Sequence, residues 1–151
     1  MWWLTRVRSG SMLPTLHDGQ LVLTRRVRRA GRIRRGDLVV VDSPEAGRLV
    51  VKRVVGLPGE LVEIVEGTVR IDGQRLPEPY ASPSVFSGVY RVPQGRYVVL
   101  GDNRDASSDS RTWLQPYVDR RAIRGRLVMP GRSRREVRAR VARHLHGHRI
   151  P

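Results

Sequence analysis

Leu49-Val50-Val51-Lys52-Arg53-Val54-Val55 is the stretch around which this sequence is organised. Its apolar and β-branched residues predict a β-strand. Successive side chains of a strand point to opposite faces, so one of Lys52 and Arg53 can be buried while the other meets water. We expect Lys52 to be the buried one. The alternative is an ordinary surface lysine on a strand.

Lys52 is the one lysine in a chain with 29 lysine and arginine residues. Arginine stays protonated at any working pH, whereas a lysine removed from water can lose its proton and act as a base. Such a base needs a nucleophile, and Ser11 is the candidate. It follows Gly10, whose small size lets a substrate backbone come close, and it precedes Pro14, which disfavours a regular strand or helix. The alternative is that this Gly-Ser pair is simply a turn.

Short apolar runs between turn residues predict further strands on both sides of the Lys52 strand. Pro58-Gly59 fits the centre of a type II turn, and Asp72-Gly73 favours a two-residue hairpin. Residues 77–88, rich in proline and serine, are expected to form an irregular surface excursion. The expected strands are residues 5–8, 20–24, 38–42, 61–65, 68–71 and 96–100.

The composition describes a strongly basic globular chain. At 151 residues, with a hydrophobic share of 39% and a formal net charge of +15, it suits one domain with a surface drawn to nucleic acid or anionic lipid headgroups. No apolar run approaches the length of a membrane span. The absence of cysteine excludes disulfides and thiolate sites. Residues 25–35 hold seven arginines, which we interpret as a solvated loop, with phosphate contact as the alternative.

The predicted strand 96–100 is followed by a polar loop, residues 101–111. It carries three aspartates, two arginines and three serines. Local hydrogen bonds of Asp and Ser side chains would explain such a loop by themselves. A loop whose start is fixed to a sheet is, however, a frequent place for a functional site. We expect Arg53 to pair with one of its aspartates and so to attach the loop to the Lys52 strand.

Four segments resemble, in order, the successive sequence boxes of bacterial type I signal peptidases, the S26-type Ser-Lys peptidases. The resemblance covers roughly residues 5–130 and implies a mainly β fold, a compact antiparallel domain of coiled sheets. The segments are residues 9–16, residues 36–40, residues 51–60, and residues 101–104 with 109–111.

The resemblance also implies roles for individual residues. Ser11 is the expected nucleophile and Lys52 the general base, and Ser9 contributes a hydroxyl to the oxyanion hole beside the backbone N–H of Ser11. Ser107 orients the lysine amine. Physical chemistry agrees with this reading, because a Ser-Lys pair needs no histidine but does need a lysine that is neutral near working pH. Met12, Leu16 and Val51 are expected to line a shallow substrate pocket. No cofactor or metal is expected.

Two features depart from the resemblance. The related enzymes usually carry an N-terminal transmembrane helix just before the first segment, whereas eight residues precede Ser9 here. We expect attachment to the plasma membrane either through an upstream helix or peripherally through arginines and the aromatic residues 2–4, with the catalytic domain on the outer face. Residues 77–95 are short for the extra β domain of larger members, so a minimal catalytic core is expected.

The tail is expected to be separate from the catalytic β domain, with 1–131 as the domain and 132–151 as a basic tail. Val137, Val141 and Leu145 recur every four residues among arginines, which predicts a short basic C-terminal helix. His144, His146 and His148 alternate too closely to share one helical face, so we interpret them as a polar tail and not as a metal site.

Together these features predict a Ser-Lys endopeptidase that removes signal peptides from exported preproteins with small residues before the cleavage site, acting at an anionic membrane surface. Within the enzyme class, the alternative is a dedicated maturation protease, of the nickel-superoxide-dismutase type, that removes one pro-sequence and is cytoplasmic. An alternative of another class is a basic β-domain that binds nucleic acid. The 5% aromatic content and the lack of basic-aromatic interleaving argue against specific nucleic-acid binding.

Overall fold

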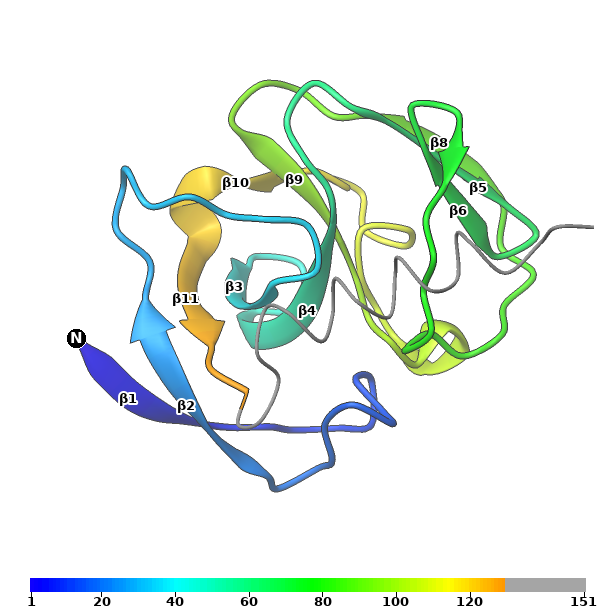
Figure 1. Cartoon of the computed structure of the whole chain (residues 1–151). Coiled ribbons are helices and arrows are strands. Elements are labelled where there is room, and N and C mark those ends of the chain that lie inside the picture. Colours follow the sequence, from blue (N-terminus) through cyan, green and yellow to red (C-terminus); the bar gives the residue numbers. More distant parts are fainter. Residues whose placement is uncertain (130–151) are drawn as a thin grey trace, which may run out of the picture.

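A computed structural model describes residues 1–129, and its regular structure is almost entirely antiparallel β (Figure 1). A seven-stranded sheet has the order β1-β2-β11-β3-β4-β9-β10, and a four-stranded sheet has the order β7-β6-β5-β8. The elements are β1 Trp2–Arg6, β2 Leu21–Arg26, β3 Leu38–Ser43, β4 Arg48–Gly56, β5 Leu61–Val65, β6 Thr68–Ile71, β7 Gln74–Arg75, β8 Gly88–Arg91, β9 Arg96–Leu100, the 3₁₀ turn Arg104–Ala106, β10 Val118–Asp119, the 3₁₀ turn Arg120–Ala122 and β11 Ile123–Leu127.

The strand that carries Lys52, β4, lies inside the larger sheet. It pairs with β3 over its first six residues and with β9 from Arg53 onward. The run of valines in β3 is explained by its position, because Val39 and Val41 pack into one apolar cluster while Val40 packs into another on the opposite face. A strand buried on both faces reads as a continuous apolar run instead of an alternating one.

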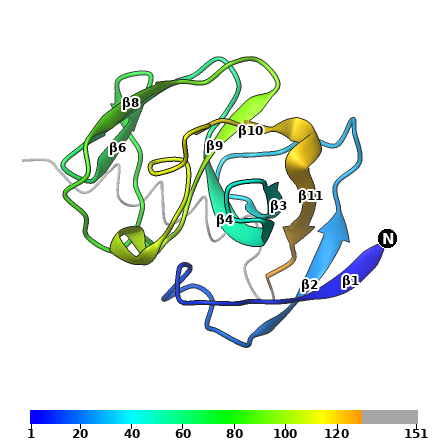
Figure 2. The same cartoon turned by 180° about the vertical axis from the view of Figure 1, so that it is seen from behind.

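The two sheets are joined by the turn between β4 and β5. Gly59 has φ +82°, and the Glu60 backbone N–H donates to the Leu57 carbonyl, as the type II turn predicted from Pro58-Gly59 requires. Views from the two sides place the small sheet and the β1–β2 hairpin at opposite ends of the molecule (Figures 1 and 2). An apolar cluster that contains Val55, Val62 and Val98 fills the space where the sheets meet.

The predicted mainly β, antiparallel fold is confirmed. Three predicted strands, 61–65, 68–71 and 96–100, have the observed bounds, and the Asp72-Gly73 hairpin is present with φ of +50° and +83°. The strand predicted at 5–8 instead begins at Trp2 and ends at Arg6. The predicted C-terminal helix and the histidines of the tail lie outside the described residues. Within residues 1–129, no helix has the length and apolar character needed to cross a bilayer.

Candidate active site

Ser11 lies in the connection between β1 and β2, in an irregular turn that the sequence predicted. The turn is closed by hydrogen bonds from the Leu13 N–H to the Gly10 carbonyl and from the Leu16 N–H to the Met12 carbonyl. Met12 and Leu16 are almost fully buried in the cluster beneath it. This apolar base holds the turn against the sheet, and Ser11 itself retains 9% exposure.

Lys52 reaches Ser11 from β4, 41 residues further along the chain. The Lys52 Nζ atom lies 2.9 Å from Ser11 Oγ, and the lysine is 3% exposed. In β4 it faces Val39 of β3 across the strand pair. Lys52 is therefore buried as expected, but the expectation that Arg53 would meet water is wrong, because Arg53 is buried as well, at 7% exposure.

Burial lowers the pKa of Lys52 from its ordinary value of 10.5 to about 8. Removal from water disfavours the ammonium form, and this is the largest cause. The nearby carboxylate of Asp109 opposes the shift, whereas the positive charges of Arg48 and Arg111 add to it. A substantial fraction of Lys52 is thus neutral at mildly alkaline pH and can accept a proton.

Arg53 pairs with Asp102, an aspartate of the 101–111 loop as expected. Its Nε and Nη2 atoms donate to the two carboxylate oxygens at 2.8 and 2.6 Å, and Asp102 is fully buried. Asp102 also accepts a hydrogen bond from the hydroxyl of Thr15, in the turn that carries Ser11. The guanidinium lies 3.7 Å from the ring centroid of Tyr80. One buried carboxylate thus links the nucleophile turn, the lysine strand and the 101–111 loop.

Asp109 organises the rest of the 101–111 loop. Its carboxylate accepts from the Gly101 N–H, from Ser107 Oγ at 2.8 Å and from the Arg111 guanidinium at 2.9 Å. Gly101 lies between Ser107 and the nucleophile turn, because a Cβ on it would lie 2.1 Å from Ser107 Oγ and 2.7 Å from the Ser11 carbonyl oxygen. Ser107 is therefore adjacent to the dyad. Within the described residues its hydroxyl bonds to Asp109 and not to Lys52.

The remaining predicted residues lie around this pair. Ser9 precedes the nucleophile by two positions, is exposed, and has φ +71°, with its N–H bonded to Asp18. Val51 packs against the apolar cluster that contains Met12 and Leu16. Met12 and Leu16 are only 1% and 0% exposed, so they underlie the site more than they line its surface.

Sequence reasoning missed several contributors to the site. Asn103 bonds to the nucleophile turn with both its backbone N–H and its side chain. Glu78 accepts from the Arg104 guanidinium and from the Tyr80 hydroxyl. The segment 77–88 is irregular as predicted, but it is not only a surface excursion, because these contacts pack it against the 101–111 loop. Its prolines and serines gave no signal for that packing.

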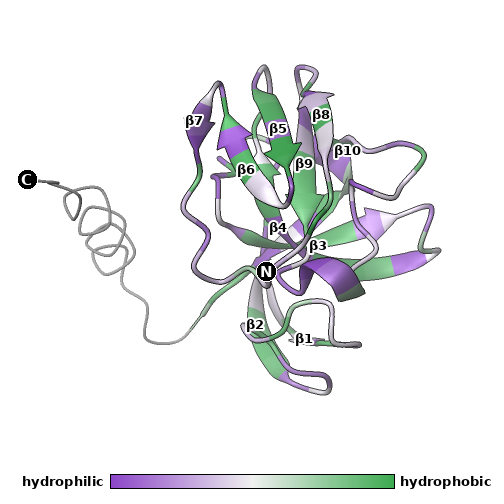
Figure 3. Cartoon of the chain, turned by 90° about the vertical axis from the view of Figure 1, so that its right-hand side faces the viewer, coloured by the Kyte–Doolittle hydropathy of each residue, from purple (hydrophilic) through white to green (hydrophobic). Residues whose placement is uncertain are grey.

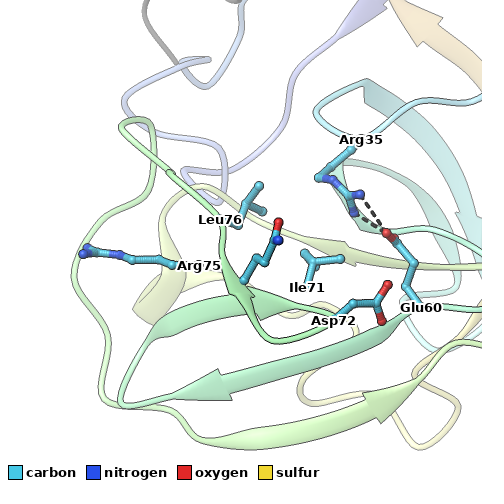
Figure 4. Close-up of a pocket in the computed structure, with 7 residues that line it drawn as sticks. Arg35, Glu60, Ile71, Asp72, Arg75 and Leu76 are labelled. Carbon is cyan, nitrogen blue, oxygen red and sulfur yellow. Dashed lines mark hydrogen bonds and ion pairs between the residues drawn. The ribbon is translucent and has the colours of Figure 1, made fainter. Parts of the chain in front are cut away.

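A cavity of about 360 Å³ is lined by residues other than the dyad (Figure 4). Arg35 and Glu60 form a bidentate ion pair at its side, with both distances at 2.7 Å, and Glu60 also accepts from the Leu57 N–H. The pair ties the β2–β3 connection to the turn between the sheets, which is a structural role. The lining residues are Arg35, Glu60, Ile71, Asp72, Gln74, Arg75 and Leu76.

A serine hydroxyl bonded to a buried lysine of lowered pKa, on an antiparallel β scaffold, has the geometry of a Ser-Lys hydrolase. Comparisons with known proteins agree. The sequence model of the family described as "Signal peptidase, peptidase S26" matches residues 1–131. This chain is 39% identical over 132 residues to a signal peptidase I of Bacillus licheniformis, covering 79% of this chain and 70% of the relative. It is 36% identical over 130 residues to signal peptidase I T of Bacillus subtilis, covering 78% and 67%.

A solved structure supports the same assignment. The crystal structure of a signal peptidase I from Enterococcus faecalis matches with a TM-score of 0.58 at 33% identity, covering 64% of this chain and 97% of that one. The chain belongs to the signal peptidase family, peptidase S26. It is a serine endopeptidase of the Ser-Lys type, and the resemblance drawn from the sequence is confirmed. The matches do not favour the alternatives of a dedicated maturation protease or a nucleic-acid-binding domain.

Proposed function

We propose that Ser11 is the nucleophile and Lys52 the general base with which this chain removes signal peptides from exported preproteins. The single observation that carries the proposal is the 2.9 Å contact between Lys52 Nζ and Ser11 Oγ, with the lysine 3% exposed. A serine hydroxyl becomes an effective nucleophile when a neighbouring base takes its proton. The lowered pKa of Lys52, about 8, gives that base a usable neutral fraction.

In the acylation step, neutral Lys52 accepts the Ser11 Oγ proton while Oγ attacks the scissile carbonyl carbon. The carbonyl π electrons move to oxygen and give a tetrahedral oxyanion. Collapse of this intermediate breaks the C–N bond, and the Lys52 ammonium returns the proton to the leaving amine. The mature protein departs with a free N-terminus, and the signal peptide remains as an ester on Ser11.

In the deacylation step, Lys52 is neutral again and takes a proton from a water that attacks the ester carbon. Collapse of the second oxyanion breaks the ester C–O bond, and the Lys52 ammonium returns its proton to Oγ, which restores the Ser11 hydroxyl. The signal peptide leaves as a carboxylic acid, which ionises in water. Ser107 is proposed to orient the lysine amine: its hydroxyl donates to Asp109, which leaves its oxygen lone pairs free to accept from the Lys52 amine.

The oxyanion is stabilised by the backbone N–H of Ser11 and the hydroxyl of Ser9. Ser9 has a left-handed backbone, φ +71°, two positions before the nucleophile, and it is exposed. Donors that are already oriented where negative charge develops lower the barrier without reorganisation during the reaction.

Substrate specificity is proposed to come from the apolar surface beneath the dyad. Met12, Leu16 and Val51 belong to one cluster below the nucleophile turn. A closely packed base beneath the nucleophile would favour a small side chain at the position before the cut and disfavour a large one. We expect cleavage after alanine and not after phenylalanine or arginine.

The substrate backbone is proposed to bind along the edge of β4 beside Lys52. β9 pairs with β4 only from Arg53 onward, so among the described residues that edge of β4 has no strand partner from Arg48 to Lys52. An extended peptide that added to this edge would pass directly by the lysine, and main-chain hydrogen bonds would hold it.

Peripheral contact with an anionic membrane is proposed through the outer face of the β1–β2 hairpin. Alternate residues of the two strands are exposed and directly opposed, so they share one face. Apolar colour runs along β2 at that end of the molecule (Figure 3). Aromatic residues sit well at the headgroup level, and arginines attract anionic lipids. The face consists of Trp2, Leu4, Arg6, Leu21, Leu23 and Arg25.

This face adjoins the turn that carries Ser11, so docking on the outer surface of the plasma membrane would bring the dyad to membrane-bound substrates. Binding to anionic vesicles should occur at low salt, fall sharply near about 1 M salt and fail on neutral vesicles. If the protein does not bind anionic vesicles even at low salt, peripheral attachment is wrong, and a transmembrane anchor becomes the better explanation.

The test of function uses a preprotein with an Ala-X-Ala site, with the cut mapped by mass spectrometry. Ser11→Ala and Lys52→Ala should abolish cleavage, and Lys52→Arg should be no better, because arginine keeps its charge and cannot act as a base. Ser87→Ala, an exposed serine of the small-sheet end, is the matched control and should cleave normally. Appreciable activity of Lys52→Arg would show that the assigned base is wrong.

A further inference from the structure

Asn103 contacts the nucleophile turn at two consecutive carbonyl groups. Its backbone N–H donates to the Ser11 carbonyl at 3.0 Å, and its Nδ2 donates to the Gly10 carbonyl at 3.0 Å. The side-chain oxygen points the other way, toward the Ser82 hydroxyl. Since a carbonyl only accepts, the assignment of Nδ2 to the Gly10 side is the one consistent with these contacts.

These two hydrogen bonds restrain both peptide groups that flank Ser11. The Gly10 carbonyl belongs to the peptide group before the nucleophile, and the Ser11 carbonyl to the one after it. A residue has only two soft backbone dihedrals, so holding both of its peptide planes fixes its backbone conformation. No other side chain among the described residues donates to either carbonyl.

The hydrogen bond from Asn103 Nδ2 to the Gly10 carbonyl also sets the direction of the Ser11 N–H. The cis peptide bond of this turn is at Leu13–Pro14, and the Gly10–Ser11 peptide is trans. In a planar trans peptide the C=O and the N–H point in opposite directions. Drawing the Gly10 oxygen toward Asn103 therefore turns the Ser11 N–H away from Asn103.

Asn103 is itself rigidly held. It follows Asp102, which is fully buried and bonded to both Arg53 and Thr15. The segment that fixes the lysine strand thus delivers the amide to the nucleophile turn. The Leu13 N–H also donates to the Gly10 carbonyl, at 3.2 Å, so the turn has support besides Asn103.

We propose that Asn103 is a positioning residue that aims the backbone N–H of Ser11 at the oxyanion. The inference rests on the proposed function, in which that N–H is an oxyanion donor. A donor that is directed at the transition state raises kcat and leaves ground-state binding nearly unchanged. Asn103 itself touches neither the substrate nor the reacting atoms.

The test compares Asn103→Ala and Asn103→Asp with Asp105→Asn, an exposed neighbour in the same loop, on a soluble peptide with an Ala-X-Ala site. Removing one oxyanion donor costs about 100- to 1,000-fold, so partial misdirection should lower kcat roughly 10- to 100-fold. KM should stay within about twofold. Asn103→Asp should lose at least as much, because a carboxylate oxygen would face the Gly10 carbonyl.

The pH profile separates aiming of the N–H from damage to the dyad. For Asn103→Ala, the rise of kcat/KM with pH should keep the midpoint of the unmodified chain, since the pKa of Lys52 is set by burial and by charged neighbours, and Asn103 carries no charge. A moved midpoint, a kcat within about threefold of normal, or a rise in KM that matches the lost kcat would overturn the proposal. The proposal would also be overturned if Asn103→Ala and Asn103→Asp both unfold while Asp105→Asn remains folded. In that case the hydrogen bonds of Asn103 would only support the fold.

The proposed function and this inference fail in different ways. If the unmodified chain does not cleave the peptide, or Ser11→Ala still does, the proposed dyad is wrong. If the unmodified chain cleaves, Ser11→Ala does not, and Asn103→Ala behaves as Asp105→Asn, the dyad stands and only the role of Asn103 is refuted.

Discussion

Replacing Lys52 with methionine should stabilise the fold near neutral pH while abolishing catalysis. The pKa of the buried amine is about 8, against 10.5 for an ordinary lysine. One pKa unit corresponds to about 1.4 kcal/mol, so the buried ammonium costs the folded state about 3 kcal/mol below pH 8. Methionine has a similar volume and no charge, but it loses the hydrogen bond to Ser11, worth about 1 kcal/mol. The net gain is about 2 kcal/mol, or about 4–8 °C in Tm.

The sign of the pH dependence is fixed by the lowered pKa. Between about 8 and 10.5 the unfolded chain binds more protons at this site than the folded one, so the unmodified protein gains stability as pH rises through that window. The advantage of Lys52→Met should therefore be full at about pH 7 and absent above 10.5. Arg91→Met, which exchanges an exposed cation on a strand of the other sheet, serves as the control.

Urea unfolding of the three proteins at about pH 7 and at about pH 10.5 measures the effect. Because Lys52 is the one lysine of the chain, ¹³C-lysine labelling would also give a single side-chain signal, whose titration should have its midpoint near 8. A variant that is no more stable than the unmodified chain at neutral pH, or a stability gain that persists unchanged at high pH, would refute the reasoning.

Three further outcomes follow from the geometry. Peptide cleavage should rise with pH through about 8 as the buried lysine loses its proton, and a pH–rate profile of kcat/KM checks this. Gly101→Ala would place a methyl 2.1 Å from Ser107 Oγ and 2.7 Å from the Ser11 carbonyl oxygen, so cleavage should fall at least about 100-fold in the same assay. Asp102→Ala would leave the buried Arg53 unpaired and should cost about 3–5 kcal/mol in urea unfolding, with part of the loss recovered when Arg53→Met is added.

The turns of the fold were predictable from the sequence, because their backbone geometry is set by the few residues within them. The type II turn at Pro58-Gly59 and the hairpin at Asp72-Gly73 were correct because each needs residues that tolerate particular backbone angles. β11 was missed although Ile123–Leu127 alternates buried and exposed positions. Its arginines and Gly125 hide the pattern, and it becomes a strand because β2 and β3 flank it.

The site was predictable only in part. The expected partner of Arg53 was an aspartate of the 101–111 loop, and Asp102 is that residue. Nothing local states that Ser11 and Lys52 meet across 41 residues, and the family resemblance supplied that pairing. Asn103 bonds to a turn 93 residues away, so neither its identity nor its neighbours in sequence revealed the contact.

The arrangement of charges explains how a lysine stays a base beside two buried carboxylates. Asp102 and Asp109 both raise the pKa of Lys52, yet each is already bonded to an arginine, Arg53 or Arg111, and Arg111 itself lowers that pKa. The carboxylates can therefore hold the loop in place without stabilising the Lys52 ammonium enough to cancel its burial. Arginine suits these partner positions because it stays charged and binds a carboxylate with two parallel hydrogen bonds. In a chain otherwise rich in arginine, position 52 is the one where a cation that can be deprotonated is required.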